Sequence, residues 1–193
     1  MNAVPVTVYH WPEMPALPSP GHPILIRVGT GLARHAARLE LRTVLRRILA
    51  VWNMLSPGPL PLIETARGPV WLGQLIGECL DISLSYAEDT GWIGLMRAGW
   101  IGVDVMRIKP ILEAEDVTRH YIGNDAWKTI QQSPDPVLAF ATAWTALEAG
   151  LKCLKLNLHE VAATHSVAPR KYAIQNTVQP DQLMVAVATI SRL

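Results

Sequence analysis

The segment 100–106 constrains the fold more than any other stretch, because it alternates in character with a period of two. The apolar members of the alternation are Ile101, Val103 and Val105. Successive side chains of a β-strand point to opposite faces, so period two is the repeat of a strand. The segment is therefore predicted to be a strand with one apolar face. Its other face would present the carboxylate of Asp104 beside Gly102.

A second segment predicts a helix that would complement this strand. Trp144, Glu148 and Lys152 recur at every fourth position and would share one stripe of a helix. Mg²⁺ prefers oxygen ligands and usually takes one or two carboxylates. Asp104 and Glu148 are therefore a candidate metal pair, and Lys152 would suit a phosphate group. Two structural alternatives stay open: an exposed Glu148–Lys152 salt bridge, and an Asp104 that caps a turn.

Three blocks of the sequence resemble the motifs of the 4′-phosphopantetheinyl transferase superfamily. Gly102-Val103-Asp104 resembles its G-[IV]-D block, and Trp144 to Lys152 resembles its W-[ST]-x-K-E-[AS]-x-x-K block. Upstream, Leu80 to Tyr86 is similar to its segment F-[NS]-[IL]-S-H. The blocks occur in the family's order and with its spacings. The chain is identified as a divergent member of the surfactin-synthetase-activating type, a two-halved single chain.

The resemblance implies an α+β fold of two similar α/β halves. Each half would have antiparallel sheets, the two would be related by a pseudo-twofold axis, and the active-site cleft would lie between them. Residues 1–103 would form the N-terminal half, with the coenzyme-binding helix and a meander. Residues 104–193 would form the C-terminal half, with the metal-site helix.

The resemblance also implies an activity, which is transfer of 4′-phosphopantetheine from coenzyme A to a serine of an acyl or peptidyl carrier protein. Mg²⁺, or alternatively Mn²⁺, would be the cofactor. Asp104 and Glu148 would bind the metal, and the catalytic residues would be these two together with Lys152. The attacking serine would belong to the carrier protein, so no nucleophile is expected in this chain.

Five residues are expected to bind the coenzyme by the same resemblance: Arg38, Arg67, Ser85, Tyr86 and Lys152. Arg38 belongs to a stripe of arginines, four residues apart, on a helix predicted from Leu32 to Met54. A solvated helix face is the alternative for this stripe. Arg67 lies in an Arg-Gly-Pro turn that is similar to the family's G-[KR]-P turn with two positions exchanged. A plain turn is the alternative there.

Three positions depart from the family pattern. Met106 stands where the family has a second carboxylate, Tyr86 where it has a histidine, and Leu147 where it has a lysine. These departures favour an alternative function, a catalytically lapsed homologue that binds coenzyme A or a carrier protein without transfer. A third hypothesis is an unrelated Mg²⁺-dependent phosphohydrolase.

Composition limits the classes of protein to consider. The chain has 193 residues, of which 50% are hydrophobic and 17% are charged, enough apolar surface for one domain or two small halves sharing a core. A net charge of +1 gives no global field that would recruit nucleic acid or an anionic membrane. The two cysteines have neither disulfide-framework nor metal-ligand spacing, and no secretory signal is apparent. We expect a cytoplasmic monomer.

The remaining patterns predict the elements around the site. Strands at 80–86, 92–97 and 100–108 are predicted to form an antiparallel meander that carries Asp104 on its last strand. A long helix is predicted at 137–156, because Ser133-Pro134-Asp135-Pro136 is a helix start signal. Further strands are predicted at 4–9, 24–28 and 183–190, and shorter helices near 113–121 and 124–132.

Overall fold

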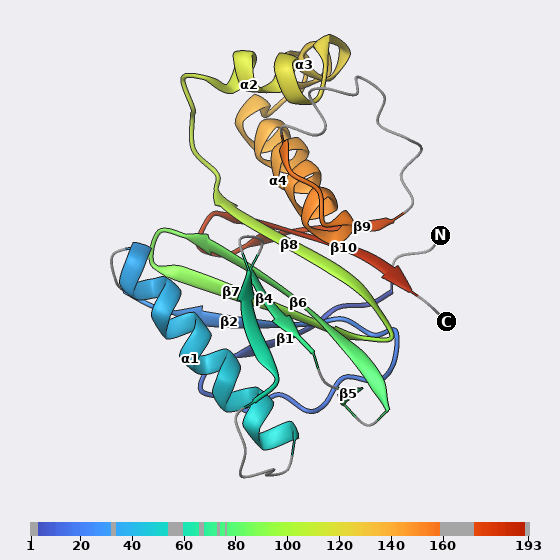
Figure 1. Ribbon diagram of the computed structural model, residues 1–193. Coiled ribbons are helices and arrows are strands. Elements are labelled where there is room, and N and C mark those ends of the chain that lie inside the picture. Colours follow the sequence, from blue (N-terminus) through green and yellow to red (C-terminus); the bar gives the residue numbers. More distant parts are fainter. Residues whose placement is uncertain are drawn as a thin grey trace.

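A computed structural model describes residues 4–31, 34–53, 60–65, 68–72, 74–75, 77–158 and 172–191 of the chain. The described residues form four layers in the order helix, sheet, sheet, helix (Figure 1). The outer layers are the helices α1 (Arg34–Trp52) and α4 (Pro136–Leu154). This architecture is α+β, as the family resemblance implies.

The larger sheet has the strand order β1-β2-β7-β6-β5. Its strands are β1 (Thr7–His10), β2 (Ile24–Gly29), β5 (Gln74–Leu75), β6 (Glu78–Ala87) and β7 (Thr90–Arg97). All neighbouring strands are antiparallel except β1 and β2, which are parallel. A separate hairpin of β3 (Leu62–Thr65) and β4 (Gly68–Trp71) lies beside β6.

Helix α1 covers one face of the larger sheet. Its buried residues follow a helical repeat and include Leu41, Leu45, Ile48 and Leu49. They pack in one cluster with the inward-facing residues of β2, β6 and β7. Complete burial of a leucine or isoleucine contributes about 1.5–3 kcal/mol, so this face holds the N-terminal part of the chain together.

The smaller sheet has the order β8-β10-β9 and packs on the other face of the larger one. Its strands are β8 (Gly99–Arg107), β9 (Ala173–Gln179) and β10 (Leu183–Ser191), all antiparallel. The apolar face of β8 packs with Trp92 and Met96 of β7 in a second core cluster. The alternation predicted for residues 100–106 is thus confirmed, and the face that carries Asp104 points away from this core.

The predicted meander is wrong in one respect. Strands β6 and β7 pair as expected, but β8 pairs with β10 instead of continuing the same sheet. The reason is that β2 and β6 already occupy both edges of β7, so β8 packs against the face of β7 instead. The boundary predicted between residues 103 and 104 falls inside β8, and the division into 1–103 and 104–193 stays a prediction.

Helix α4 begins where its start signal predicts. Asp135 caps the helix by accepting a hydrogen bond from the amide of Leu138 at 2.9 Å, and Pro136 occupies the first turn. Before it come α2 (Ala114–Tyr121) and α3 (Asn124–Gln131), which pack at the end of the molecule (Figure 1). Helix α4 is long and apolar enough to cross a membrane, a property that the core helices of soluble proteins share.

A glycine lets α4 approach β8 closely. A Cβ at Gly102 would lie 1.9 Å from the carbonyl oxygen of Ala149 and 2.4 Å from the amide nitrogen of Cys153, both on the α4 backbone. Alanines on α4 and β10 line the same contact. Only a residue without a side chain fits between these backbones, so Gly102 sets the distance between the strand of Asp104 and the helix of Glu148 and Lys152.

Candidate functional site

Lys152, Asp104 and Ser85 meet between α4, β8 and β6. The Nζ atom of Lys152 donates to Oδ1 of Asp104 at 2.7 Å, to the carbonyl oxygen of Val103 at 3.0 Å and to Oγ of Ser85 at 3.3 Å. The hydroxyl of Ser85 donates to the same Oδ1 at 2.9 Å. The contact joins one residue from each of the three motif blocks, and Asp104 is only 8% exposed within it.

A row of polar side chains on β6 fixes the position of β8. Asp81, Ser83 and Ser85 share one face of β6, and their oxygens accept hydrogen bonds from backbone amides of β8. The three bonds run from Ile101 N to Asp81 at 2.8 Å, from Val103 N to Ser83 at 2.9 Å and from Val105 N to Ser85 at 3.2 Å. The opposite edge of β8 pairs with β10, so this row satisfies buried amides that no neighbouring strand reaches.

Glu148 lies one helical turn before Lys152 and is half-buried. Its burial and the negative charge of Asp104 raise the pKa of its carboxyl, and the positive charge of Lys152 acts in the opposite direction. Within the described part of the chain, the Glu148 carboxylate has no hydrogen-bond or ion-pair partner. A desolvated carboxylate beside a like charge is suited to accept a proton or to bind a cation.

Asp104 and Glu148 are ligands of the type that Mg²⁺ prefers. Among the residues that the structure describes, no three His, Cys, Asp or Glu side chains gather in a way that could hold a metal ion. Mg²⁺ needs no larger set, because it keeps several waters and shares ligands with substrate phosphates. Oδ1 of Asp104 is taken by Ser85 and Lys152, while its Oδ2 accepts no hydrogen bond from the described residues. Oδ2 of Asp104 and the carboxylate of Glu148 are therefore the oxygen atoms that could bind the metal.

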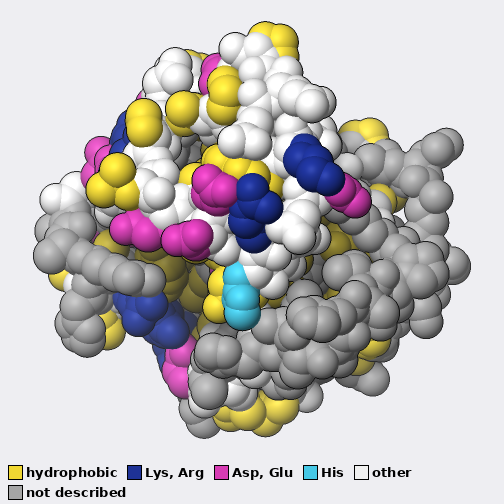
Figure 2. Space-filling model, turned by 90° about the horizontal axis from the view of Figure 1, so that it is seen from above, with side chains coloured by type: hydrophobic (Ala, Val, Ile, Leu, Met, Phe, Trp, Pro, Cys, Tyr) yellow, Lys and Arg dark blue, Asp and Glu magenta, His cyan; other side chains and the backbone are white. Residues whose placement is uncertain are grey.

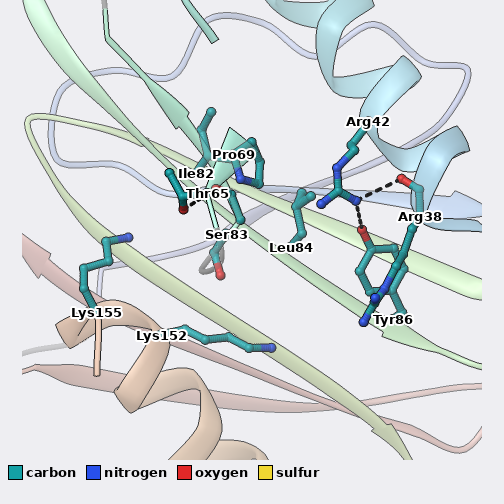
Figure 3. Close-up of a pocket in the computed structure, with 11 residues that line it drawn as sticks. Arg38, Arg42, Thr65, Pro69, Ile82, Ser83, Leu84, Tyr86, Lys152 and Lys155 are labelled. Atoms are coloured by element: carbon teal, nitrogen blue, oxygen red, sulfur yellow. Dashed lines mark hydrogen bonds between the residues drawn. The ribbon is translucent and has the colours of Figure 1, made fainter. Parts of the chain in front are cut away.

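A cavity of about 240 Å³ opens beside this contact and has a basic lining. Figure 3 shows Lys152 and Lys155 reaching into it from α4, and Arg38 and Arg42 from α1, with β6 between them. The lining also includes Ser83 and Tyr86 of β6, and Thr65, Gly68 and Pro69 of the β3–β4 hairpin. Four cationic side chains around one cavity favour a ligand with several negative charges.

Arg38 and Tyr86 lie together at the α1 side of the cavity, where the resemblance expects coenzyme contacts. The guanidinium of Arg38 lies 5.7 Å from the centre of the Tyr86 ring, and Nη1 of Arg42 donates to Oη of Tyr86 at 3.2 Å. Arg42 also forms an ion pair with Glu64 of the hairpin at 2.9 Å. Burial raises the pKa of Tyr86, which keeps its phenol protonated and able to donate a hydrogen bond.

Arg67 lies outside the described residues, although its neighbours Gly68 and Pro69 line the cavity.

Two other residues of this region, Asp81 and Lys155, were not predicted from the sequence. They form an ion pair at 2.8 Å, and Lys155 lines the cavity. The available signal was the i, i+3 spacing of Lys152 and Lys155, which would place both lysines on one side of the helix predicted at 137–156.

Leu147, which replaces the family's lysine, belongs to a different surface. It lines an apolar groove of about 810 Å³ between α2, α3 and α4, together with residues such as Leu138, Ile130 and Tyr172. Trp144 also turns toward this end of the molecule, where it packs against Phe140 and Tyr121. Figure 2 views this end, where charges of both signs are mixed with apolar side chains on the described surface. Leucine at position 147 therefore removes no charge from the lining of the basic cavity.

Comparison with known protein families finds a match for part of the chain. A family model of the 4′-phosphopantetheinyl transferase superfamily matches residues 101–182. The matched segment contains β8 with Asp104 and α4 with Glu148 and Lys152. No curated protein matches the chain. Residues 101–182 thus carry the family's pattern, and the match supports phosphopantetheine transfer as the general activity.

Proposed function

We propose that this protein transfers 4′-phosphopantetheine from coenzyme A to a serine of an acyl or peptidyl carrier protein, with Mg²⁺ as cofactor. The observation that carries the proposal is the contact of Lys152 with both Asp104 and Ser85 beside a basic cavity. This contact joins the three motif blocks in space. The family match at residues 101–182 supports the same general activity.

The reaction assigns each residue a task. The carrier's serine oxygen forms a bond to the phosphorus that bears pantetheine, and the bond from this phosphorus to the bridging oxygen breaks. Adenosine 3′,5′-bisphosphate then leaves. Glu148 would accept the serine proton, directly or through a water. Lys152 would balance charge on the phosphates, while Ser85 orients Asp104 through its hydrogen bond.

Asp104 and Glu148 would hold the metal. When bound, Mg²⁺ would neutralise negative charge that develops on the leaving group. The cationic residues of the cavity would hold the remaining phosphate and the nucleotide part of the coenzyme. Arg38 and Tyr86 are the residues that the resemblance assigns to this task, and both line the cavity.

The proposal includes the two-halved arrangement of the surfactin-synthetase-activating type. In its support, each of the two main sheets carries one long helix, α1 on the larger sheet and α4 on the smaller. The basic cavity receives side chains from both helices, as a site between two halves would.

The alternative, a lapsed homologue that only binds, is favoured by the departures at Met106, Tyr86 and Leu147. The position of Leu147 in the apolar groove weakens this reading, because a lysine there would not line the basic cavity. The three residues with assigned chemistry, Asp104, Glu148 and Lys152, are all present.

Intact-mass spectrometry of apo carrier proteins tests the proposed function. Each carrier is incubated with the wild-type chain, coenzyme A and Mg²⁺, and should gain the mass of one phosphopantetheine arm. Asp104→Asn should abolish the gain. Lys128→Gln, on the exposed surface of α3, is the control and should leave the gain unchanged.

Three results would count against transfer. If several acyl and peptidyl carriers gain no mass but coenzyme A with Mg²⁺ still raises the melting temperature of the chain, the binding-module function replaces transfer. If coenzyme A also leaves the melting temperature unchanged, neither function stands. Hydrolysis of nucleotides without a carrier would favour the phosphohydrolase instead.

A further inference from the structure

Lys155 adds a second lysine to the wall of the basic cavity. Its Nζ donates to Oδ2 of Asp81 at 2.8 Å, and the same oxygen accepts the amide of Ile101 at 2.8 Å. The carboxylate of Asp81 is therefore fixed by β8 and in turn fixes the ammonium of Lys155. Figure 3 shows the Lys155 side chain reaching from α4 toward the cavity beside Ser83 and Thr65.

The backbone of Lys155 adopts a conformation that lysine rarely takes. The residue caps the C-terminus of α4 with φ of 59° and ψ of 32°, in the left-handed region. Glycine is the usual residue at such a helix end, because a Cβ makes this conformation unfavourable. A disfavoured backbone that delivers a cation to a cavity wall is a reason to look for a function of that cation.

Lys152 and Lys155 contact opposite ends of the row formed by Asp81, Ser83 and Ser85. Lys152 is bound at Ser85 and Lys155 at Asp81. These two β6 residues are separated by about 13 Å along the strand at the rise of an extended chain. An extended ligand in the cavity would therefore meet the two lysines at different points.

The hydrogen bonds of Lys152 explain why a second lysine matters. An ammonium has three donors, and those of Lys152 are directed at Asp104, Val103 and Ser85. Lys152 can act on a ligand through its charge, but a new hydrogen bond would require one of these to break. The Lys155–Asp81 pair is partly exposed, with side chains 39% and 18% accessible, and such a pair is easily shared with an incoming anion.

We propose that Lys155 is a further ligand-binding residue of this cavity and that its ammonium binds a phosphate group of the coenzyme. The inference rests on the proposed function, because it takes coenzyme A as the ligand. The phosphate is either part of the diphosphate or the 3′-phosphate, and both offer the charged oxygens that an ammonium binds.

Isothermal titration calorimetry of the full chain tests the proposal. The two ligands are coenzyme A and dephospho-coenzyme A, which lacks the 3′-phosphate. The variant is Lys155→Gly, since glycine fits the left-handed backbone and removes only the side chain. Its melting temperature should be no lower than that of the wild type, while its affinity for coenzyme A should fall about tenfold. Lys128→Gln is again the control and should bind like the wild type.

The two ligands identify the phosphate. If Lys155→Gly loses affinity for coenzyme A only, Lys155 binds the 3′-phosphate. If it loses affinity equally for both ligands, Lys155 binds the diphosphate. Unchanged affinity of Lys155→Gly for both ligands would overturn the inference and leave the proposed function intact. If the wild-type chain binds neither ligand, the proposed function fails and this inference fails with it.

Discussion

Two adjacent faces of α4 differ in charge and in what they contact. One carries Glu148 and Lys152 and meets Asp104 beside a cavity lined by four cationic side chains. The other carries Leu147 and lines an apolar groove with α2 and α3. Neighbouring residues on one helix thus serve different surfaces. A departure from a family motif can be interpreted only when the face on which it falls is known.

The largest effect is expected from the polar face. Glu148→Gln keeps the shape of the side chain but removes the proposed proton acceptor and one of the two proposed metal ligands. The rate of phosphopantetheine transfer should fall about a thousandfold, as measured by the initial rate of carrier mass gain. Glu115→Gln, an exposed carboxylate on α2, is the matched control. Wild-type rates for Glu148→Gln would show that this face of α4 is not the reacting one.

The contact between α4 and β8 should be the most sensitive to added volume. Gly102→Ala places a methyl group against backbone atoms of Ala149 and Cys153, which cannot rotate away. The free energy of unfolding in urea should fall by roughly 3 kcal/mol. Gly29→Ala is the control, because no atom lies within 4 Å of the added methyl group. Equal stabilities for the two variants would mean that the close approach is not required.

Glu148 should also make the stability of the fold depend on pH. Its pKa is raised in the folded state above the ordinary value of 4.5, so the folded chain holds this proton to a higher pH than the unfolded chain. The protonated Glu148 carboxyl stabilises the folded chain. This stabilisation is fully present below the pKa that Glu148 has in the unfolded chain, and it is lost as the pH rises through its pKa in the folded chain. Compared with Glu148→Gln, the wild type should therefore lose stability across this window, as followed by melting temperature. Parallel pH profiles for the two proteins would contradict the raised pKa.

The smallest effect is expected from the apolar face. Leu147→Lys restores the family's lysine, but at a position that lines the groove. The rate of transfer should stay within about twofold of the wild type, and the free energy of unfolding should change by less than about 1 kcal/mol. A gain in rate of tenfold or more would show that position 147 reaches the basic cavity, and would remove the distinction between the two faces.

Periodicity and caps predicted the elements well where local chemistry decides them. The alternation of Ile101, Val103 and Val105 predicted which face of β8 packs against β7, and the Asp135-Pro136 signal predicted the start of α4. The positions of Asp104, Glu148 and Lys152 also followed from spacing on these elements. Each of these predictions depends only on residues that are close in the sequence.

The partners of the strands could not be predicted in the same way. The pairing of β8 with β10 depends on residues some eighty positions apart and on β2 having taken the free edge of β7. The amide contacts of Asp81 and Ser83 depend on the same arrangement. The contact of Lys155 with Asp81 likewise joins residues 74 positions apart.

Coupling between Mg²⁺ and coenzyme A tests most directly whether Asp104 and Glu148 act as one metal site. Calorimetric titration of the wild-type chain with coenzyme A, with and without Mg²⁺, should give at least about tenfold tighter binding with the metal. Asp104→Asn should lose this difference but keep the metal-free affinity within a few-fold. Equal affinities of the wild type with and without Mg²⁺ would contradict a metal site formed by these two carboxylates.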